Sequence, residues 1–178
     1  MKKYPILKFG VIAVMISFLL SSCSGNSQEK KKTDSLMNER IMQMNKARLA
    51  SESKRIDDFV AEKKFNMQRS GTGLRYEIYQ HGAGKRTAAH DTVEVKYKIY
   101  LLDGTLCYSS DSSGNAKFSL GHGQQVSGLE EGILMMQAGD KARFILPNHL
   151  AYGLSGDSKK IPPAQPVYFD IELINVRK

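Results

Sequence analysis

Residues 93–105 have the sequence Val93-Glu94-Val95-Lys96-Tyr97-Lys98-Ile99-Tyr100-Leu101-Leu102-Asp103-Gly104-Thr105. From Val93 to Ile99, apolar side chains alternate with charged ones, which is the pattern of a strand with one buried and one solvated face. Asp103-Gly104 then interrupts this pattern, and the dipeptide favours a tight turn because it accepts positive φ angles. The stretch therefore predicts a β-hairpin.

The same period-two alternation recurs elsewhere and predicts further strands of the same sheet. It is clear from Leu74 to Ile78 and from Val167 to Leu173, and it is weaker from Ala142 to Leu146. One short helix is predicted from Leu129 to Gln137, with two glutamates in its first turn and Gly139 as the residue after its end. We therefore expect an α+β fold, an antiparallel sheet with one short helix packed on it.

Residues 1–22 have the features of an export signal. Lysines precede an apolar run from Phe9 to Leu20, about a dozen residues long, whereas roughly 20 are needed to span a bilayer. The sequence Leu20-Ser21-Ser22-Cys23 resembles a lipobox, so we expect lipidation of Cys23. The mature protein would then be lipid-anchored to the cell envelope, at the outer membrane and facing the periplasm. The alternative is an ordinary signal peptide or an anchor helix with an incidental cysteine.

A lipidated tether and a helical stalk are expected to follow the signal. Residues 23–34 are polar and lysine-rich, which is typical of a disordered segment. Residues 35–68 contain no glycine or proline and are rich in helix-forming side chains. Such a helix packs its apolar side chains either on its own domain or on a second copy, so a homodimer through the stalk is one expected arrangement. Two apolar clusters recur at helical spacing: Met37, Ile41 and Met44, then Ile56, Phe59 and Val60.

The remaining composition argues against several kinds of site. Because residues 1–22 carry three lysines and no acidic residue, their removal would lower the formal net charge from +8 to +5. That charge is mild and scattered, so nucleic-acid binding is not supported. The two cysteines, Cys23 and Cys107, do not make a disulfide framework if the first is lipidated. The four histidines lack the short paired spacing of zinc motifs, so we expect them in surface or loop positions and predict no metal and no cofactor.

An ordered series of short motifs extends from Gly73 to Lys178, and it resembles the FKBP-type peptidyl-prolyl cis–trans isomerase domain. This resemblance assigns residues 69–178 to the isomerase domain and implies an FKBP-like sheet wrapped on the short helix. The stalk and anchor make the chain similar to envelope foldases of the macrophage-infectivity-potentiator kind and to FKBP-like lipoproteins associated with gliding motility. The motifs, in order, are Val93-Glu94-Val95-Lys96-Tyr97, Asp103-Gly104-Thr105, Ser109-Ser110, Phe118-Ser119-Leu120-Gly121, Gly128-Leu129-Glu130-Glu131-Gly132, Met136-Gln137-Ala138-Gly139-Asp140-Lys141, Ala151-Tyr152-Gly153, Ile161-Pro162-Pro163 and Phe169-Asp170-Ile171-Glu172-Leu173.

The resemblance implies isomerisation of X–Pro bonds in proline-containing polypeptide clients. Resonance opposes rotation about a peptide bond with a barrier of about 18–20 kcal/mol. The planar amide is more charge-separated than the twisted one, so an apolar pocket that excludes water favours the twisted transition state. Such a reaction needs no nucleophile, metal or acid–base pair, and the chain shows no constellation of that kind.

The resemblance also implies which residues form the pocket. Tyr97, Tyr152 and Phe169 are the expected catalytic residues, and Leu129 would form the floor. The Tyr152 hydroxyl would donate to a substrate carbonyl, and the backbone N–H of Ile161 would be a second donor. The expected substrate-binding residues are Phe118, Val126, Leu129, Ile161 and Tyr108.

Several positions depart from the family pattern and imply a more open or more polar pocket. Cys107-Tyr108 stands where the family usually has Phe-Asp, and Ala116 stands where another aromatic residue is common. Gln125 and Lys160 replace apolar residues at the rim. Two functions therefore stay open from the sequence: a peptidyl-prolyl isomerase for exported proteins, or a weakly catalytic binding or chaperone module in an envelope complex.

Overall fold

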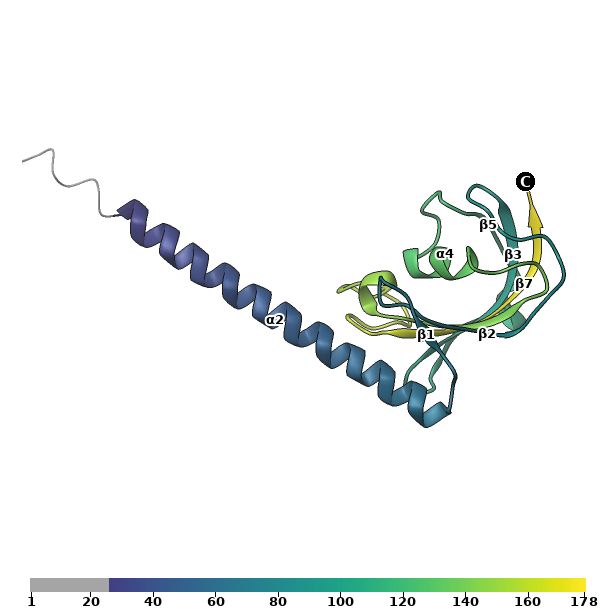
Figure 1. Ribbon diagram of the computed structural model, residues 1–178, viewed down its shortest axis with the longest axis horizontal. Coiled ribbons are helices and arrows are strands. Elements are labelled where there is room, and N and C mark those ends of the chain that lie inside the picture. The colour runs from purple at the N-terminus through teal and green to yellow at the C-terminus, as the bar shows by residue number, and fades with distance from the viewer. Residues whose placement is uncertain (1–25) are drawn as a thin grey trace, which may run out of the picture. The chain divides into compact units, whose positions relative to one another are not determined.

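The computed structural model describes residues 26–178 (Figure 1). The chain divides into two compact units after Arg48, and each is described by itself. The elements, in order, are helix α2 (Asn26–Lys63), strands β1 (Gln68–Arg69), β2 (Arg75–Gln80), β3 (Thr92–Leu101) and β4 (Leu106–Ser109), helix α3 (Ser110–Ser113), strand β5 (Ala116–Ser119), helix α4 (Ser127–Ile133), strand β6 (Lys141–Leu146), a 3₁₀ turn η1 (Asn148–Leu150) and strand β7 (Val167–Arg177).

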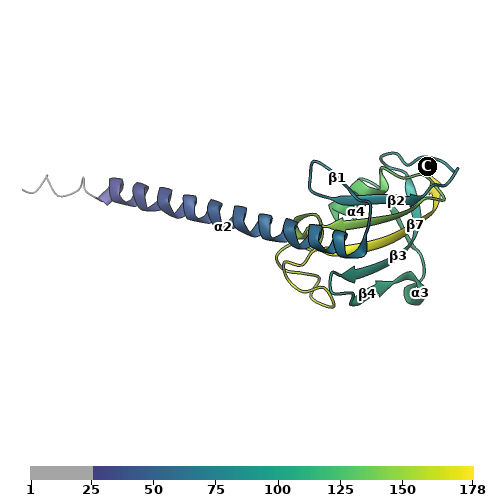
Figure 2. The same cartoon turned by 60° about the horizontal axis from the view of Figure 1, so that its bottom comes forward.

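The strands of residues 49–178 form one antiparallel sheet in the order β1-β2-β6-β7-β3-β4. Figure 2 shows β1 and β2 toward one edge of this sheet and β4 toward the other. Strand β3 pairs with β7 along its whole length, while its other side pairs with β5 near Val93 and with β4 near Ile99. The predicted strands and the hairpin at Gly104, which has φ +90°, are therefore confirmed.

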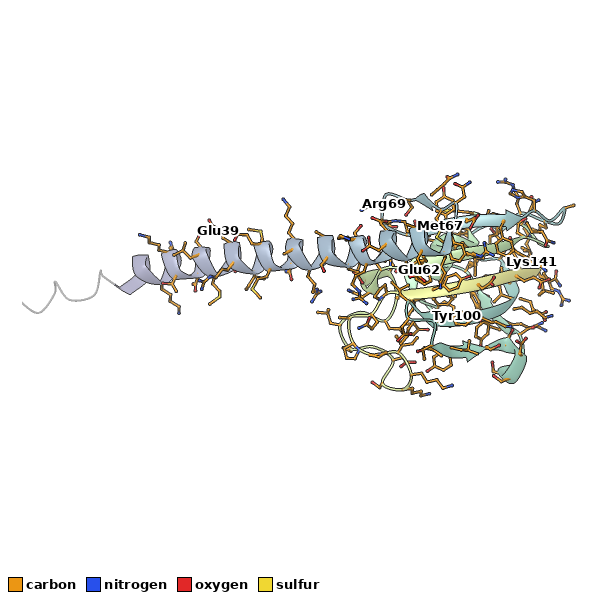
Figure 3. The ribbon with its side chains drawn as sticks, turned by 90° about the horizontal axis from the view of Figure 1, so that it is seen from below. Glu39, Glu62, Met67, Arg69, Tyr100 and Lys141 are labelled. Atoms are coloured by element: carbon orange, nitrogen blue, oxygen red, sulfur yellow. The ribbon has the colours of Figure 1, made fainter. Side chains whose placement is uncertain are left out.

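The sheet separates two apolar clusters, because neighbouring residues of a strand point to opposite faces. Phe144 lies in the main core, which α4 covers on the concave face of the sheet (Figure 1). The next residue, Ile145, lies in a second cluster with Ile56 and Phe59 from the end of α2. Figure 3 shows Met67 close to this end of the helix.

Helix α4 is shorter than the sequence predicted. It begins at Ser127 and ends at Ile133, whereas the expected range was Leu129 to Gln137. The backbone then tightens into i→i+3 turns, and the Thr87 hydroxyl hydrogen-bonds the carbonyl oxygens of Ile133 and Met136, both at 2.9 Å. The prediction that Gly139 directly follows the helix was wrong: Gly139 has φ +91° but lies in the loop before β6.

Two glycines bring α4 close to the sheet. A Cβ atom on Gly132 would lie 2.7 Å from the Phe144 ring, and one on Gly128 would lie 2.7 Å from Cγ of Leu146. Real Cβ atoms essentially never approach heavy atoms this closely. The backbone of α4 therefore packs directly against side chains of β6, and this contact sets the height of Leu129 above the sheet.

The N-terminal region differs from the prediction in one respect. Helix α2 begins at Asn26, so residues 26–34 are helical where a disordered tether was expected, in keeping with their lysine side chains, which favour helices. The second compact unit begins at Leu49, and it includes Ile56 and Phe59, which are buried. The expected signal at residues 1–22 and the lipidation site Cys23 lie outside the described residues.

Residues 26–48 bury none of the apolar side chains predicted for the first cluster. Met37, Ile41 and Met44 are 55%, 48% and 70% exposed. Within residues 26–178, no helix combines the length and the apolar character that crossing a bilayer requires.

Candidate active site

A pocket of about 360 Å³ opens on the face of the sheet that carries α4. Its walls come from β3, β4, β5, β7 and α4 and from the loop between η1 and β7. Phe169 on β7 lies opposite Ile99 on β3, so the central strand pair supplies the apolar base. The lining residues are Val95, Tyr97, Ile99, Tyr108, Ala116, Phe118, Gln125, Leu129, Tyr152, Asp157, Lys159 and Phe169.

The structure brings most of the predicted site residues together. All three expected catalytic residues line the pocket, as do three of the expected substrate-binding residues. Phe118, Leu129 and Phe169 are each at most 5% exposed, so they also belong to the core. The predicted residues found in the lining are Tyr97, Tyr108, Phe118, Leu129, Tyr152 and Phe169.

Two predicted residues do not line the pocket. Val126 is the N-cap of α4 and packs against the core. Ile161 is 2% exposed, and its backbone N–H donates to Oδ1 of Asp157 at 2.8 Å. The N–H that was expected to be a donor for the substrate is thus used here by the chain's own carboxylate.

Asp157 is the central residue of the loop that closes one side of the pocket, and it was not among the site residues predicted from the sequence. Its carboxylate accepts hydrogen bonds from the backbone N–H groups of Lys159, Lys160 and Ile161, at 2.9, 3.0 and 2.8 Å. It also accepts a hydrogen bond from the Tyr108 hydroxyl on β4. This single side chain therefore holds the loop in shape and joins it to the opposite wall.

These contacts keep Asp157 ionised. Burial by itself would raise the pKa of Asp157, but the hydrogen bonds from Tyr108 and from the loop backbone outweigh it and lower the pKa to about 2. The same hydrogen bond to Asp157, aided by burial, raises the pKa of Tyr108. The pair is thus an ionised acceptor and a protonated donor at neutral pH.

Tyr152 differs from Tyr108, because its hydroxyl forms no hydrogen bond with the described part of the chain. Burial, and then the nearby charge of Asp157, raise the pKa of Tyr152 to about 12. Among residues 26–178, no side chain or backbone group hydrogen-bonds this hydroxyl. Tyr152 therefore presents a protonated hydroxyl that can donate to a bound carbonyl.

Tyr97 is oriented by the segment that follows β4. Its hydroxyl lies 2.9 Å from Oγ of Ser113, and its backbone N–H donates to Oγ of Ser110 at 3.1 Å. The partner of the Tyr97 hydroxyl is therefore a serine, and a carboxylate of this pocket comes from Asp157.

Cys107 lies behind the wall that Tyr108 forms. Its side chain is 1% exposed, and its Sγ donates to the carbonyl oxygen of Lys160 at 3.7 Å. Burial raises the pKa of the Cys107 thiol. The thiol therefore fills space behind the pocket. Within residues 26–178, no group of three His, Cys, Asp or Glu side chains is arranged to hold a metal ion.

Comparison with known proteins agrees with this geometry. Residues 84–174 match the model of the family described as FKBP-type peptidyl-prolyl cis-trans isomerase. The chain is 34% identical over 114 residues to a probable FKBP-type peptidyl-prolyl cis-trans isomerase FkpA of Neisseria meningitidis, covering 64% of this chain and 41% of that protein. It is 36% identical over 107 residues to an FK506-binding protein 1A of Neurospora crassa, covering 59% of this chain and 89% of that protein.

The fold is also similar to solved structures. The crystal structure of FkpA from Escherichia coli aligns over 94% of this chain and 81% of that chain, with a TM-score of 0.64 and 30% identity. This chain spans about half or less of the length of several curated relatives, including 41% of the Neisseria protein and 54% of a macrophage infectivity potentiator of Trypanosoma cruzi. The family match, the strand order and the pocket agree, and the chain belongs to the FKBP-type peptidyl-prolyl cis–trans isomerase family.

Proposed function

We propose that this protein isomerises X–Pro bonds in polypeptides of the cell envelope, using the pocket around Phe169. The observation that carries the proposal is the combination of an apolar base with one protonated, unengaged hydroxyl on Tyr152. A prolyl ring that packs on Phe169 and Leu129 would lose its hydration. The loss of water would destabilise the planar amide more than the twisted amide, because the planar form is more charge-separated. The Tyr152 hydroxyl would hold a client carbonyl while the bond rotates.

The pocket differs from the arrangement implied by resemblance, because one of the two expected donors is already used within the chain. The Ile161 N–H already serves Asp157. We therefore propose that orientation of the client depends more on Tyr152 than a two-donor site would require. Removing its hydroxyl should cost one hydrogen bond in the transition state, about 0.5–1.5 kcal/mol, or roughly a two- to thirteenfold loss of kcat/KM.

Proline-limited refolding of a model protein tests this proposal. Tyr152→Phe should slow the accelerated phase by that factor, whereas Tyr76→Phe should leave it unchanged. Tyr76 is a matched control, because its hydroxyl bonds Gln68 and it does not line the pocket. Phe169→Leu should also lower kcat/KM, and it retains most of the buried volume, whereas truncation to alanine would cost about 3–5 kcal/mol of stability. No acceleration by the folded parent protein would contradict the proposal.

A second candidate function is a binding or chaperone module that holds extended chains with little turnover. The polar rim favours it, since Lys159, Gln125 and the ionised Asp157 line the pocket beside the apolar base. Suppression of client aggregation that survives Tyr152→Phe and Phe169→Leu, without any acceleration of refolding, would select this function.

We further propose that Cys23 carries a lipid anchor and that the exposed stripe of Met37, Ile41 and Met44 pairs two copies. The lipobox-like sequence supports the anchor, and the exposure of these apolar side chains supports the pairing. Metabolic labelling with a radioactive fatty acid should fail for Cys23→Ser. Sedimentation equilibrium should give a dimer that dissociates in Ile41→Glu, and a parent protein that is monomeric at micromolar concentration would contradict the pairing.

A further inference from the structure

Two exposed histidines, far apart in the sequence, come together in the structure. His90 lies in the loop between β2 and β3, and His122 lies in the turn between β5 and α4. Nδ1 of His90 is 3.4 Å from Nε2 of His122. The ring centroids are 5.2 Å apart, and the ring planes make an angle of 61°.

Without a metal, the two rings share one long hydrogen bond, and the tautomers decide which ring donates it. An N–H donor and its acceptor usually lie about 2.7–3.2 Å apart and are close to collinear. A collinear contact of this length would separate the ring centroids by about 5.7 Å. The observed 5.2 Å shows that the axes of the two ring nitrogens are bent away from the line that joins them.

The same geometry fits two ligands of one tetrahedral metal ion. Imidazole nitrogens bind Zn²⁺ at about 2.0–2.1 Å, so two of them on one tetrahedral ion lie about 3.3–3.4 Å apart. Their ring centroids then lie about 5.2 Å apart. Both values agree with the structure, whereas adjacent ligands of a square-planar ion would bring the nitrogens to about 2.8 Å.

The backbone around the two histidines is held in place without any metal. The N–H of His90 donates to the carbonyl of Leu120 at 3.1 Å, and the N–H of Leu120 donates to the carbonyl of Asp91 at 2.9 Å. The N–H of Gly121 donates to the Glu130 carboxylate at 3.3 Å, which ties the turn of His122 to α4. The two rings therefore project from segments that are already joined, so that little ordering would be needed to bind an ion.

The Asp91 side chain forms hydrogen bonds that hold the loop around His90 in shape. It is 3% exposed and accepts hydrogen bonds from Nζ of Lys85 at 2.8 Å and from the N–H of Ala88 at 3.0 Å. Because these contacts use the carboxylate, Asp91 holds the loop in shape and leaves the two imidazoles as the ligands.

We propose that His90 and His122 together bind one divalent transition-metal ion of the Zn²⁺ type, with water in the remaining positions. Imidazole is a ligand that suits zinc, and an open site with water ligands is usual where the protein supplies few groups. Because His122 is followed closely by Gln125 of the pocket lining, a bound ion would join the β2–β3 loop to the rim of the pocket. The proposal does not rest on isomerase activity.

Calorimetric titration of the full-length, chelator-treated protein with ZnCl₂ at pH 7.5 tests the site. The parent protein should bind one ion, and His90→Ala and His122→Ala should each weaken binding at least about tenfold. The double variant should bind no more weakly than either single variant, because both histidines are needed and the loss of one already removes the site. His81→Ala is the matched control, since His81 is exposed and belongs to a different segment.

Two further measurements keep the result interpretable. Circular dichroism of each variant without zinc should match the parent, because both histidines are exposed. Backbone amide NMR should show zinc-dependent shifts confined to residues 88–92 and 119–125. Undiminished binding in His90→Ala or His122→Ala, equal loss in His81→Ala, or no binding by the parent would each overturn the proposal.

Discussion

The hydroxyl of Tyr108 donates a hydrogen bond to the carboxylate of Asp157, joining β4 to the loop before β7 across 49 residues of sequence. The same carboxylate accepts a hydrogen bond from the backbone N–H of Ile161. Tyr108 and Asp157 therefore act together, since removing either one releases a donor or an acceptor at the pocket wall. We regard them as positioning residues for Tyr152 and the rim.

A double-mutant cycle should detect this coupling. Tyr108→Phe and Asp157→Asn should each lower the free energy of unfolding, and the double variant should lose less than the sum by about 1 kcal/mol. Urea unfolding measures the four free energies. Tyr76→Phe combined with Asp157→Asn is the control and should be additive, because Tyr76 bonds Gln68 away from this loop. Additivity of Tyr108→Phe with Asp157→Asn would show that the contact is not formed in solution.

Stability should also depend on pH through Asp157. Its pKa is about 2 in the folded protein, against an ordinary value of 3.8. A carboxyl group whose pKa is lowered by folding stabilises the folded protein at pH values above its pKa in the unfolded chain. That contribution is lost as the pH falls toward its pKa in the folded protein. The difference in unfolding free energy between the parent and Asp157→Asn should be full above about pH 4.5 and should shrink toward pH 2. A difference that grows on acidification would contradict the assignment.

Replacing an isoleucine by alanine should have different effects on stability in the two parts of α2. Ile56 is fully buried, so Ile56→Ala should lower the free energy of unfolding by about 2–5 kcal/mol. Ile41 is 48% exposed, so Ile41→Ala should change it by less than about 0.5 kcal/mol at concentrations where the protein is monomeric. Denaturant titration of both variants gives the comparison. Equal effects would mean that the unit beginning at Leu49 has been placed wrongly.

Adding a methyl group at Gly132 should be costly. Gly132→Ala would bring a Cβ to within 2.7 Å of the Phe144 ring, and overpacking of this kind costs about 1–3 kcal/mol. Gly71→Ala is the control, because a Cβ there meets no atom within 4 Å. Thermal unfolding should show a lower Tm for Gly132→Ala and no decrease for Gly71→Ala. An unchanged Tm for Gly132→Ala would show that α4 can move away at no cost.

The long strands could be predicted from the sequence, whereas the short elements could not. The alternation from Val93 to Ile99 is long enough to define a period, but β1 has two residues and β5 has four. The end of α4 depends on Thr87, which lies 46 residues before Ile133, and no local pattern records such a contact. Helix propensity at residues 26–34 was underestimated because a lysine-rich composition is shared by tethers and helices.

Some residues of the pocket could likewise be predicted from the sequence, and others could not. Family motifs located Tyr97, Tyr152 and Phe169, because these residues stand inside motifs of characteristic spacing. Asp157 could not be located, because its function depends on a loop that folds back on its own backbone and on Tyr108. The departure at Tyr108 was visible in the sequence, but nothing there indicated that Asp157 would accept its hydrogen bond.

The absence of side chains at Gly128 and Gly132 of α4 also has a consequence for the shape of the pocket. Because neither residue has a side chain, α4 packs close to β6. Leu129 therefore lies close to the sheet, and the pocket extends over it. The space above Leu129 therefore depends on two residues that do not line the pocket. Replacing either glycine would change the shape of the pocket without altering any residue of its wall.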